Sequence, residues 1–354
     1  MIERIAIFRA LQLGDMLCCV PALRALRAAH PRAHLVLIGL PWASSFVTRY
    51  RPLIDELVPF PGAVGFPEQE ESDAGLPSFW SAMQERRFDL AIQLHGSGGV
   101  ANDIVERMGA HLNAGYLKPD EAMREGVFIP WPDTLPEIAR YNALMDALGI
   151  DASHTDLDIP LSDEDIRECA GLLDAYELDS TRLVLVHAGS QLPSRRWPAE
   201  RFAQMALSLA HAGWQIALTG SAGEAPITSH IARALEGCDA IDLTGKTSLG
   251  GLAALVAKAQ LVVCNDTGIS HIAAAMRTKS VVIASGSDTR RWAPLDHERH
   301  RVLADYPSCR PCSFRDCPYG HPCALNISVA QVLDVAHAQL LEPRFHMAPI
   351  HAHC

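Results

Sequence analysis

The stretch Asn265–Ala275, which reads Asn-Asp-Thr-Gly-Ile-Ser-His-Ile-Ala-Ala-Ala, decides how the rest of the chain is interpreted. The apolar run Ala259–Cys264 precedes it and predicts a strand that is buried on both faces. The small residues that follow predict a helix that begins at the Asp-Thr-Gly turn. Backbone N–H groups at the start of a helix bind phosphate, so we expect this turn to hold the diphosphate of a nucleotide. The alternative is that Asp266 and Thr267 only cap the helix.

Strands and helices alternate in the first half of the chain. A helical period over Gly14–His30 separates two short apolar runs, Arg4–Phe8 and Ala33–Gly39. Such a βαβ unit implies a parallel sheet. Further strands are expected at Glu56–Phe60, Phe88–Leu94 and Val127–Ile129. The segment Phe60–Ser78 is rich in Pro, Gly and acidic residues, which indicates a mobile surface loop.

The same alternation returns in the second half. A capping box at Ser162–Asp165 predicts a helix over Glu164–Tyr176, near the junction of two domains. Strands and helices are then expected in turn at Leu183–His187, Glu200–Ala212, Gln215–Thr219, Pro226–Leu235, Ala240–Asp242, Leu249–Ala257, Ala259–Cys264 and Ser280–Ala284. The sequence therefore predicts an α/β protein with two doubly wound, Rossmann-like domains that face a central cleft.

The length of 354 residues fits two domains of ordinary size. We expect an N-terminal domain over residues 1–165 and a C-terminal domain over residues 166–328. In residues 329–354, a helix at Val329–Leu341 is expected to pack back across the junction, and a flexible tail is expected to follow it.

The charge of the chain limits its partners. The net charge of −11 argues against a nucleic-acid binder. Residues 1–60, however, hold seven Arg and only four acidic residues, so this part could face an anionic acceptor or a membrane surface. Scattered surface arginines are the alternative. The sequence has no apolar run of about 18 residues and no signal peptide, so a cytoplasmic protein without a membrane span is expected, with its ten cysteines mostly reduced.

Two residues after the first strand are candidates for chemistry. Gly14 lets the backbone approach a ligand closely. Asp15 follows at the start of the helix, where the helix N-terminus stabilises the charged carboxylate. A carboxylate in this place can accept the proton of an attacking hydroxyl. The alternative is an ordinary acid in the first turn of a helix.

The loop after Leu183–His187 combines small residues, a hydroxyl and guanidinium groups. Ser190 is followed by Arg195 and Arg196. Arginine binds phosphate oxygens in a bidentate manner and keeps its charge, so this loop suits a diphosphate. The alternative is that the arginines are solvated loop charges beside a packing anchor, Trp197, and one of the two is expected to be so.

A third loop, Leu218–Glu224, follows the next strand. The Glu224 carboxylate is a candidate acceptor for hydrogen bonds from ribose hydroxyls. The alternative is that Glu224 caps the helix that starts near Pro226.

Two further patterns are ambiguous. Gly96–Ala101 matches the G-x-G-x-x-A dinucleotide fingerprint, but Asp120, the acid about 20 residues on, does not end a convincing strand. We therefore discount a dehydrogenase. The second pattern is a dense thiol cluster made of Cys309, Cys312, Cys317 and Cys323. Four thiolates could hold zinc, and an iron–sulfur site, a disulfide-capable loop or unligated cysteines are the alternatives.

Taken together, these loops resemble glycosyltransferase family 9, the ADP-heptose:lipopolysaccharide heptosyltransferases. The likeness extends from Ile5 to about Leu340. It is carried by the segments Arg9–Asp15, Val186–Ser190, Arg196–Phe202, Leu218–Glu224 and Asp266–Ala275. The resemblance implies a GT-B fold, with an acceptor domain followed by a donor domain.

The resemblance also implies an inverting transfer from a nucleotide sugar. Asp15 would be the general base on the acceptor hydroxyl, with Gly14 in the acceptor-side loop. The implied donor-binding residues are Ser190, Arg195, Glu224, Asp266, Thr267, Gly268 and His271. No cofactor and no tightly bound metal would be required. The implied partners are an ADP-heptose-like donor and a glycolipid acceptor at the inner membrane leaflet, where the protein could associate peripherally.

Two other functions stay open at this stage. The first is a transferase of the same fold that uses another nucleotide sugar or acceptor. The second is a non-catalytic nucleotide-sugar-binding protein that senses a metal through its thiol cluster. The joint presence of Asp15, Ser190, Arg195, Glu224 and Asp266 argues against the second.

Overall fold

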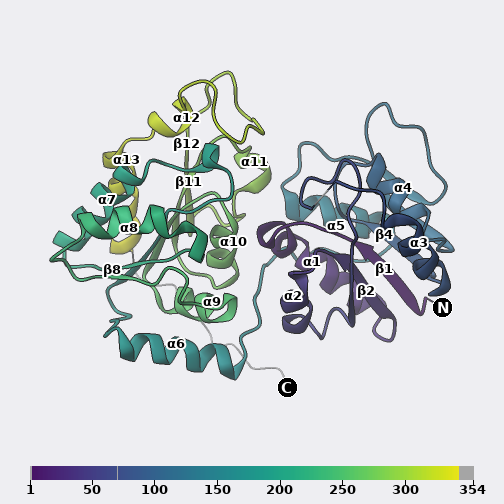
Figure 1. The fold of residues 1–354 in the computed structure, drawn as a ribbon, viewed down its shortest axis with the longest axis horizontal. Coiled ribbons are helices and arrows are strands. Elements are labelled where there is room, and N and C mark those ends of the chain that lie inside the picture. Colours follow the sequence, from purple (N-terminus) through teal and green to yellow (C-terminus); the bar gives the residue numbers. More distant parts are fainter. Residues whose placement is uncertain (1, 70, 343–354) are drawn as a thin grey trace. The chain divides into compact units, whose positions relative to one another are not determined.

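The computed structural model describes residues 2–69 and 71–342. The chain forms two compact units, which divide between Pro160 and Leu161. Each unit is built on a six-stranded sheet whose strand pairs are all parallel, with helices in the connections (Figure 1). The predicted α/β class with two doubly wound units is confirmed.

The first unit contains six strands and five helices among the described residues. Its strands are β1 (Arg4–Phe8), β2 (His34–Gly39), β3 (Glu56–Pro59), β4 (Leu90–Gln93), β5 (Leu112–Leu117) and β6 (Val127–Pro130). Its helices are α1 (Leu13–Ala29), α2 (Ala43–Arg49), α3 (Leu76–Glu85), α4 (Val100–Glu106) and α5 (Glu137–Ala147). In Figure 1, β1 lies beside β2 and β4, as the register of the sheet requires.

The second unit repeats the pattern. Its strands are β7 (Leu183–His187), β8 (Gln215–Leu218), β9 (Ala240–Asp242), β10 (Leu261–Asn265), β11 (Ser280–Ala284) and β12 (His300–Ala304). Its helices are α6 (Asp163–Ala175), α7 (Ala199–His211), α8 (Ala225–Ala234), α9 (Leu249–Lys258), α10 (Gly268–Ala275), α11 (Thr289–Trp292), α12 (Pro322–Leu325) and α13 (Val329–Leu341). Two short 3₁₀ turns, η1 (Pro193–Arg195) and η2 (Ala222–Glu224), precede α7 and α8.

Both sheets have the same strand order. The first is β3-β2-β1-β4-β5-β6, and the second, counted from its own first strand, has the equivalent order β9-β8-β7-β10-β11-β12. In such a sheet the connections change direction between the first and fourth strands, and ligands bind there at the carboxyl ends of the strands. The switch points lie between β1 and β4 in the first unit, and between β7 and β10 in the second.

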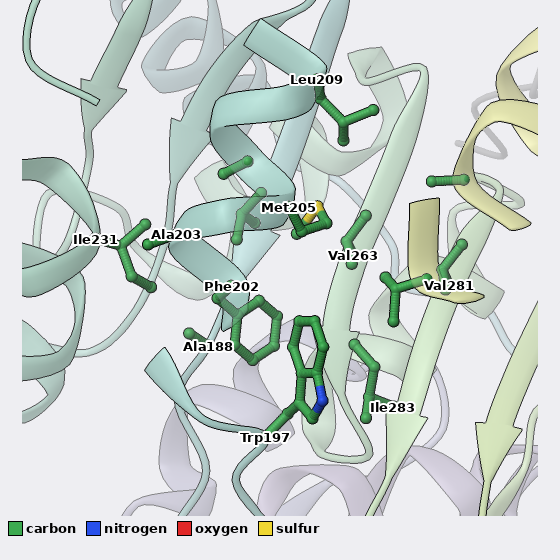
Figure 2. Close-up of a cluster of buried hydrophobic side chains, with 14 of the residues drawn as sticks. Ala188, Trp197, Phe202, Ala203, Met205, Leu209, Ile231, Val263, Val281 and Ile283 are labelled. Atoms are coloured by element: carbon green, nitrogen blue, oxygen red, sulfur yellow. The ribbon is translucent and has the colours of Figure 1, made fainter. Parts of the chain in front are cut away.

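The core of the second unit positions the loops after β7 and β10. Trp197 is only 1 % exposed and its indole Nε1 donates to the Ile327 carbonyl, 2.9 Å away. Figure 2 shows its ring between Phe202 and Ile283, with the Phe202 ring centroid 5.0 Å away in an edge-to-face arrangement. The expected packing anchor is therefore confirmed, and it fixes the residues on either side of it.

Several boundaries differ from the expectation. The predicted division after residue 165 falls inside α6, because the capping box at Ser162 and Asp165 starts that helix as part of the second unit. The helix α13, expected to pack across the junction, packs against α7, β10 and β11 of its own unit. The flexible tail predicted after it, residues 343–354, lies outside the described residues.

Parts of the segment predicted to be a mobile surface loop, Phe60–Ser78, pack into the first unit. Phe60 and Phe66 are buried in the core of the first unit, and α3 begins inside the segment. Its acids accept hydrogen bonds from the backbone: the Glu71 carboxylate from Gly65 N–H at 2.9 Å and the Asp73 carboxylate from Val64 N–H at 2.9 Å. The acidic residues therefore shape the loop rather than only solvate it.

No helix within residues 2–69 and 71–342 combines the length and the apolar character that a bilayer span needs.

Candidate active site

Asp15 lies in the first turn of α1, at the switch point of the first sheet. The backbone carbonyl of Asp15 accepts hydrogen bonds from two nitrogens of Arg9, with Nε at 3.1 Å. The third nitrogen of Arg9 donates to the Leu94 carbonyl at the end of β4. The preceding Gly14 is also in α1, so the predicted acceptor-side residues stand at the carboxyl end of β1.

His95 lies at the same sheet edge and was not among the predicted site residues. Its ring stacks on Phe8 with a centroid distance of 5.0 Å, and the edge of Phe66 packs against it. The Nδ1 atom accepts from Ala10 N–H at 3.2 Å, so the neutral ring carries its proton on Nε2. Burial, and then the positive charge of Arg9, lower the pKa of His95 to about 3. His95 is therefore a neutral hydrogen-bond donor at physiological pH.

A second carboxyl group, Glu68, stands within electrostatic range of Asp15. Burial, with a smaller contribution from the negative charge of Asp15, raises the pKa of Glu68. Its Oε2 atom is buried and has no hydrogen-bond partner. Glu68 comes from the acidic loop between β3 and α3, and its position could not be predicted because that loop has no periodic pattern.

The discounted dinucleotide fingerprint is occupied by a carboxylate of the chain itself. Gly99 N–H donates to both oxygens of Glu121, each at 3.0 Å, and Asn102 Nδ2 donates to one of them at 3.1 Å. Burial opposes ionisation of Glu121, but these hydrogen bonds and those from Lys118 and Arg124 outweigh it and lower its pKa. An internal anion therefore stands where a dinucleotide phosphate would bind, which explains physically why the fingerprint is a decoy.

In the second unit, Asn265 joins the two loops at the switch point. Its Oδ1 atom accepts from Trp197 N–H at 2.9 Å, and its Nδ2 atom donates to the Ala188 carbonyl at 2.8 Å. The residue is fully buried, so both ends of the amide satisfy backbone groups that water cannot reach. Asn265 thus sets the loop after β7 against the end of β10.

The two arginines of the loop after β7 are both bound. Arg196 donates from Nε and Nη2 to the Ser190 carbonyl, at 2.9 and 2.7 Å, so it braces this loop rather than extending into solvent. Arg195 donates from Nη1 to the Ser285 carbonyl at 3.0 Å and from Nη2 to the Cys312 carbonyl. The expectation that one arginine is merely solvated is therefore wrong, because backbone carbonyls of the unit hold both guanidinium groups.

Burial lowers the pKa of Arg195, and the charges of Cys312 and Asp266 oppose this lowering. The Ser287 hydroxyl donates to the Asp266 carboxylate. Thr267 is the N-cap of α10, with Gly268 as the first helical residue, and the Thr267 side chain makes no capping hydrogen bond. The capping alternative therefore does not describe Thr267. His271 is buried further along α10.

Glu224 is bound in a way that keeps it next to the loop after β7. Its Oε2 atom accepts from Ser221 N–H at 2.7 Å and from the Ser221 hydroxyl at 2.9 Å. A Cβ atom on Gly189 would lie 1.8 Å from Glu224 Oε1, so only glycine lets the carboxylate stand against this backbone. The Glu224 side chain does not cap α8 itself, but its bonds to Ser221 complete the capping box of η2, the turn that leads into α8.

The cysteine-rich segment is anchored to the same loops. Ser194 N–H donates to the Arg315 carbonyl at 3.0 Å, His321 Nε2 lies 2.9 Å from the Ser194 carbonyl, and Cys312 N–H donates to the Gly286 carbonyl at 2.9 Å. Arg310 donates from Nε to the Ser287 carbonyl at 2.7 Å. Sequence reasoning assigned no role to Arg310, Ser287 or Gly286, because only the fold brings them to the donor-side loops.

The four cysteines of this segment, Cys309, Cys312, Cys317 and Cys323, are free thiols. Among the side chains that the structure describes, no three of His, Cys, Asp or Glu are grouped so that they could share a metal ion. Burial raises the pKa of Cys323, so its thiol is protonated at neutral pH.

Known proteins share both the sequence pattern and the fold. The family model of glycosyltransferase family 9 (heptosyltransferase) matches residues 76–322. Lipopolysaccharide heptosyltransferase 2 of Salmonella typhimurium is 26% identical over 351 residues, which cover 93% of this chain and 96% of that protein.

Two solved structures show the same architecture. The glycosyl transferase family 9 protein of Veillonella parvula aligns with a TM-score of 0.77 at 24% identity, over 96% of this chain and 98% of that one. The ADP-heptose lipopolysaccharide heptosyltransferase II of E. coli aligns with a TM-score of 0.70 at 22% identity, over 96% and 99%. The fold is therefore of the GT-B class. The match over most of the chain shows that this protein is a glycosyltransferase and belongs to family 9, the heptosyltransferases.

Proposed function

We propose that the chain transfers a heptose-type sugar from ADP-heptose to an acceptor of the lipopolysaccharide core, with inversion at the anomeric carbon. The observation that carries this proposal is the placement of the predicted residues. Asp15 stands at the switch point of the first sheet, and Ser190 and Asp266 stand at the switch point of the second. These are the positions at which Rossmann-like sheets bind ligands.

In the proposed reaction the Asp15 carboxylate takes the proton of an acceptor hydroxyl. The hydroxyl oxygen forms a bond to the anomeric carbon of the donor. The bond between that carbon and the diphosphate oxygen breaks, and ADP leaves with the electron pair. Attack from the face opposite the leaving group inverts the configuration. The position of Asp15 in the first turn of α1 supports this role, because the helix N-terminus favours the ionised carboxylate.

On the donor side, Arg195, Ser190 and the backbone at Thr267 and Gly268 would stabilise the charge that develops on the leaving diphosphate. Two facts support this assignment. The first N–H groups of α10 are not capped by the Thr267 side chain, and Arg195 is held by two carbonyls from different loops. Glu224 would accept hydrogen bonds from the ribose, and Asp266 and His271 would orient the donor.

The acceptor is proposed to be a glycolipid at the inner membrane leaflet, which a cytoplasmic enzyme would reach peripherally. The relatives named above as lipopolysaccharide heptosyltransferases support this class of acceptor.

The test replaces Asp15 with Asn, which has nearly the same shape but cannot accept the proton. Turnover of ADP-heptose with a truncated lipopolysaccharide core that lacks the transferred heptose should fall by roughly 10²–10⁴-fold, while ADP affinity stays within about twofold. ADP release and the mass of the glycolipid product are measured together.

Asp103→Asn is the matched control, because Asp103 is also an acid in the first turn of a helix, α4, and belongs to the same unit as Asp15. This variant should keep wild-type turnover. If Asp15→Asn transferred heptose at the wild-type rate, Asp15 would not be the base. If the wild-type enzyme accepted a UDP-sugar or GDP-sugar in place of ADP-heptose, the function would be that of another GT-B transferase.

A further inference from the structure

Arg9 has no exposed surface, although it carries a full positive charge. Its Nε and Nη2 atoms donate to the Asp15 carbonyl, and its Nη1 atom donates to the Leu94 carbonyl. The guanidinium carbon lies 4.3 Å from the centroid of the Tyr141 ring on α5. One buried side chain thus ties the first turn of α1 to the end of β4, and α5 covers it.

Burying a cation costs free energy that hydrogen bonds to carbonyls only partly return. A neutral side chain could pack here without that cost. A buried positive charge at this position would stabilise a nearby carboxylate in its ionised form. The carboxyl group nearest to Arg9 along the chain is that of Asp15.

Some of the charged and titratable groups around Asp15 favour ionisation of its carboxyl group, and others oppose it. Arg9, at the end of β1, favours the ionised carboxylate. Glu68, from the loop after β3, is an acid whose charge opposes it, and Glu137, on α5, is an acid that acts on Arg9 and on Cys18. Tyr141, Cys18 and Cys19 also interact with the Asp15 charge, and His95 interacts with Arg9.

The titration behaviour of these groups follows from the same geometry. Burial alone would lower the pKa of Arg9, but attraction to the ionised forms of Tyr141, Cys19, Asp15 and Glu137 outweighs it and raises the pKa; at neutral pH the two carboxylates supply this attraction. Burial raises the pKa of Cys18, and it raises that of Cys19 to about 11, so both thiols stay neutral. His95 is neutral as well, whereas Arg9 is a cation that attracts the Asp15 charge.

We infer that Arg9 is a positioning residue for the transfer reaction: it fixes the first turn of α1 and supplies the buried positive charge that keeps the Asp15 side chain ionised between turnovers. The inference rests on the proposed role of Asp15 as the base. Arg9 does not touch the substrate in this scheme. It holds the carboxylate in place before proton transfer, and its charge helps to release the proton afterwards.

The test is the pH profile of kcat/KM for Arg9→Met, with ADP-heptose and the truncated lipopolysaccharide core as substrates. Without the cation, Asp15 binds its proton more readily, so the acidic limb of the profile should move to higher pH by about one unit. The maximal rate should also fall, on the order of 10²-fold, because the helix turn loses its anchor.

Two variants separate charge from structure. Arg9→Lys keeps the charge but loses the fork of donors, so its rate should fall while the acidic limb stays in place. Arg27→Met removes a partly buried arginine of the same unit, in the last turn of α1, that bonds to the Ala33 and Leu53 carbonyls. This control variant should lower the melting temperature without moving the acidic limb of the pH profile. If Arg9→Met does not fold, Arg9→Gln, which keeps a donor and lacks the charge, carries the same expected shift.

The outcomes are distinguishable from a failure of the proposed function. If Asp15→Asn abolishes transfer but a folded Arg9→Met or Arg9→Gln keeps the wild-type acidic limb, the inference about Arg9 is wrong. The role of Asp15 as the general base is then still supported. If Asp15→Asn is fully active, the proposed function itself is wrong.

Discussion

Gly286 illustrates how one residue constrains the donor side. Its φ of +70° lies in the left-handed region, and a Cβ atom there would stand 2.5 Å from Arg195 Nη1 and 3.1 Å from Cys312 Sγ. Gly286→Ala should therefore cost about 1 kcal/mol or more in backbone strain and should also displace Arg195. We expect ADP affinity, measured by calorimetry, to fall at least tenfold if Arg195 binds the diphosphate.

The matched control is Gly237→Ala. Gly237 has a φ of +84° and nothing within 4 Å of its added Cβ atom, so this variant carries the backbone strain without the collision. It should lower the melting temperature and leave ADP affinity unchanged. Equal ADP affinity in both variants would mean that Arg195 does not contact the nucleotide.

At the same scale, the residues that sequence reasoning missed have partners far away in the chain. Asn265 was quoted only as the first residue after a predicted strand, yet it bonds to Trp197 and Ala188, which are 68 and 77 residues earlier. His95 meets Ala10 across 85 residues. A turn or a cap can be predicted because its partners are local, whereas these contacts exist only once the strands are in register.

Among elements, the strands and helices with a clear apolar pattern were predicted correctly, such as β10 and α1. Helix α5 was not predicted, and its residues explain why. It buries Glu137 and Arg140, which pair with each other at 3.1 Å, and the Tyr141 hydroxyl donates to Glu137. Charged residues on the buried face hide the helical period of hydrophobic residues on which the prediction depends.

The strand β12 was missed for a similar reason, and it carries a prediction of its own. His300, its first residue, is 2 % exposed and stands opposite Ser280 of β11, with the hydroxyl 2.8 Å from Nδ1. Burial lowers the pKa of His300 to about 4, although Asp296 acts in the opposite direction. The folded protein therefore resists protonation at a site that the unfolded chain protonates near pH 6.5.

The stability that depends on a neutral, buried His300 is fully present above pH 6.5 and is lost as the pH falls toward 4. At pH 5 the loss should be about 2 kcal/mol relative to pH 7. His300→Gln cannot titrate, so its free energy of unfolding in urea should depend less on pH over this range. An identical pH dependence in the variant and the wild type would contradict the lowered pKa.

At the scale of the whole molecule, the repeated strand order explains why the candidate site could be inferred at all. Loops that follow the first and fourth strands of a doubly wound sheet meet at the switch point, whatever their distance in the chain. The sequence showed which loops follow strands, so it indicated which residues gather. It could not show that Glu121 fills the glycine-rich loop after β4, or that Arg195 is held by carbonyls from two other loops.

The second unit has its own sheet and core, and its last helix is tied into it. Lys279 Nζ donates to the carbonyls of Gln339 and Glu342, each at 2.7 Å, which fastens α13 beside β11. A chain of residues 161–342 should therefore unfold cooperatively by itself. Because every proposed donor-binding residue lies within it, this chain should bind ADP as tightly as the whole protein does, and more tightly than UDP or GDP. Calorimetry on both chains measures this. ADP binding more than tenfold weaker in the isolated unit would show that residues 1–160 take part in holding the nucleotide.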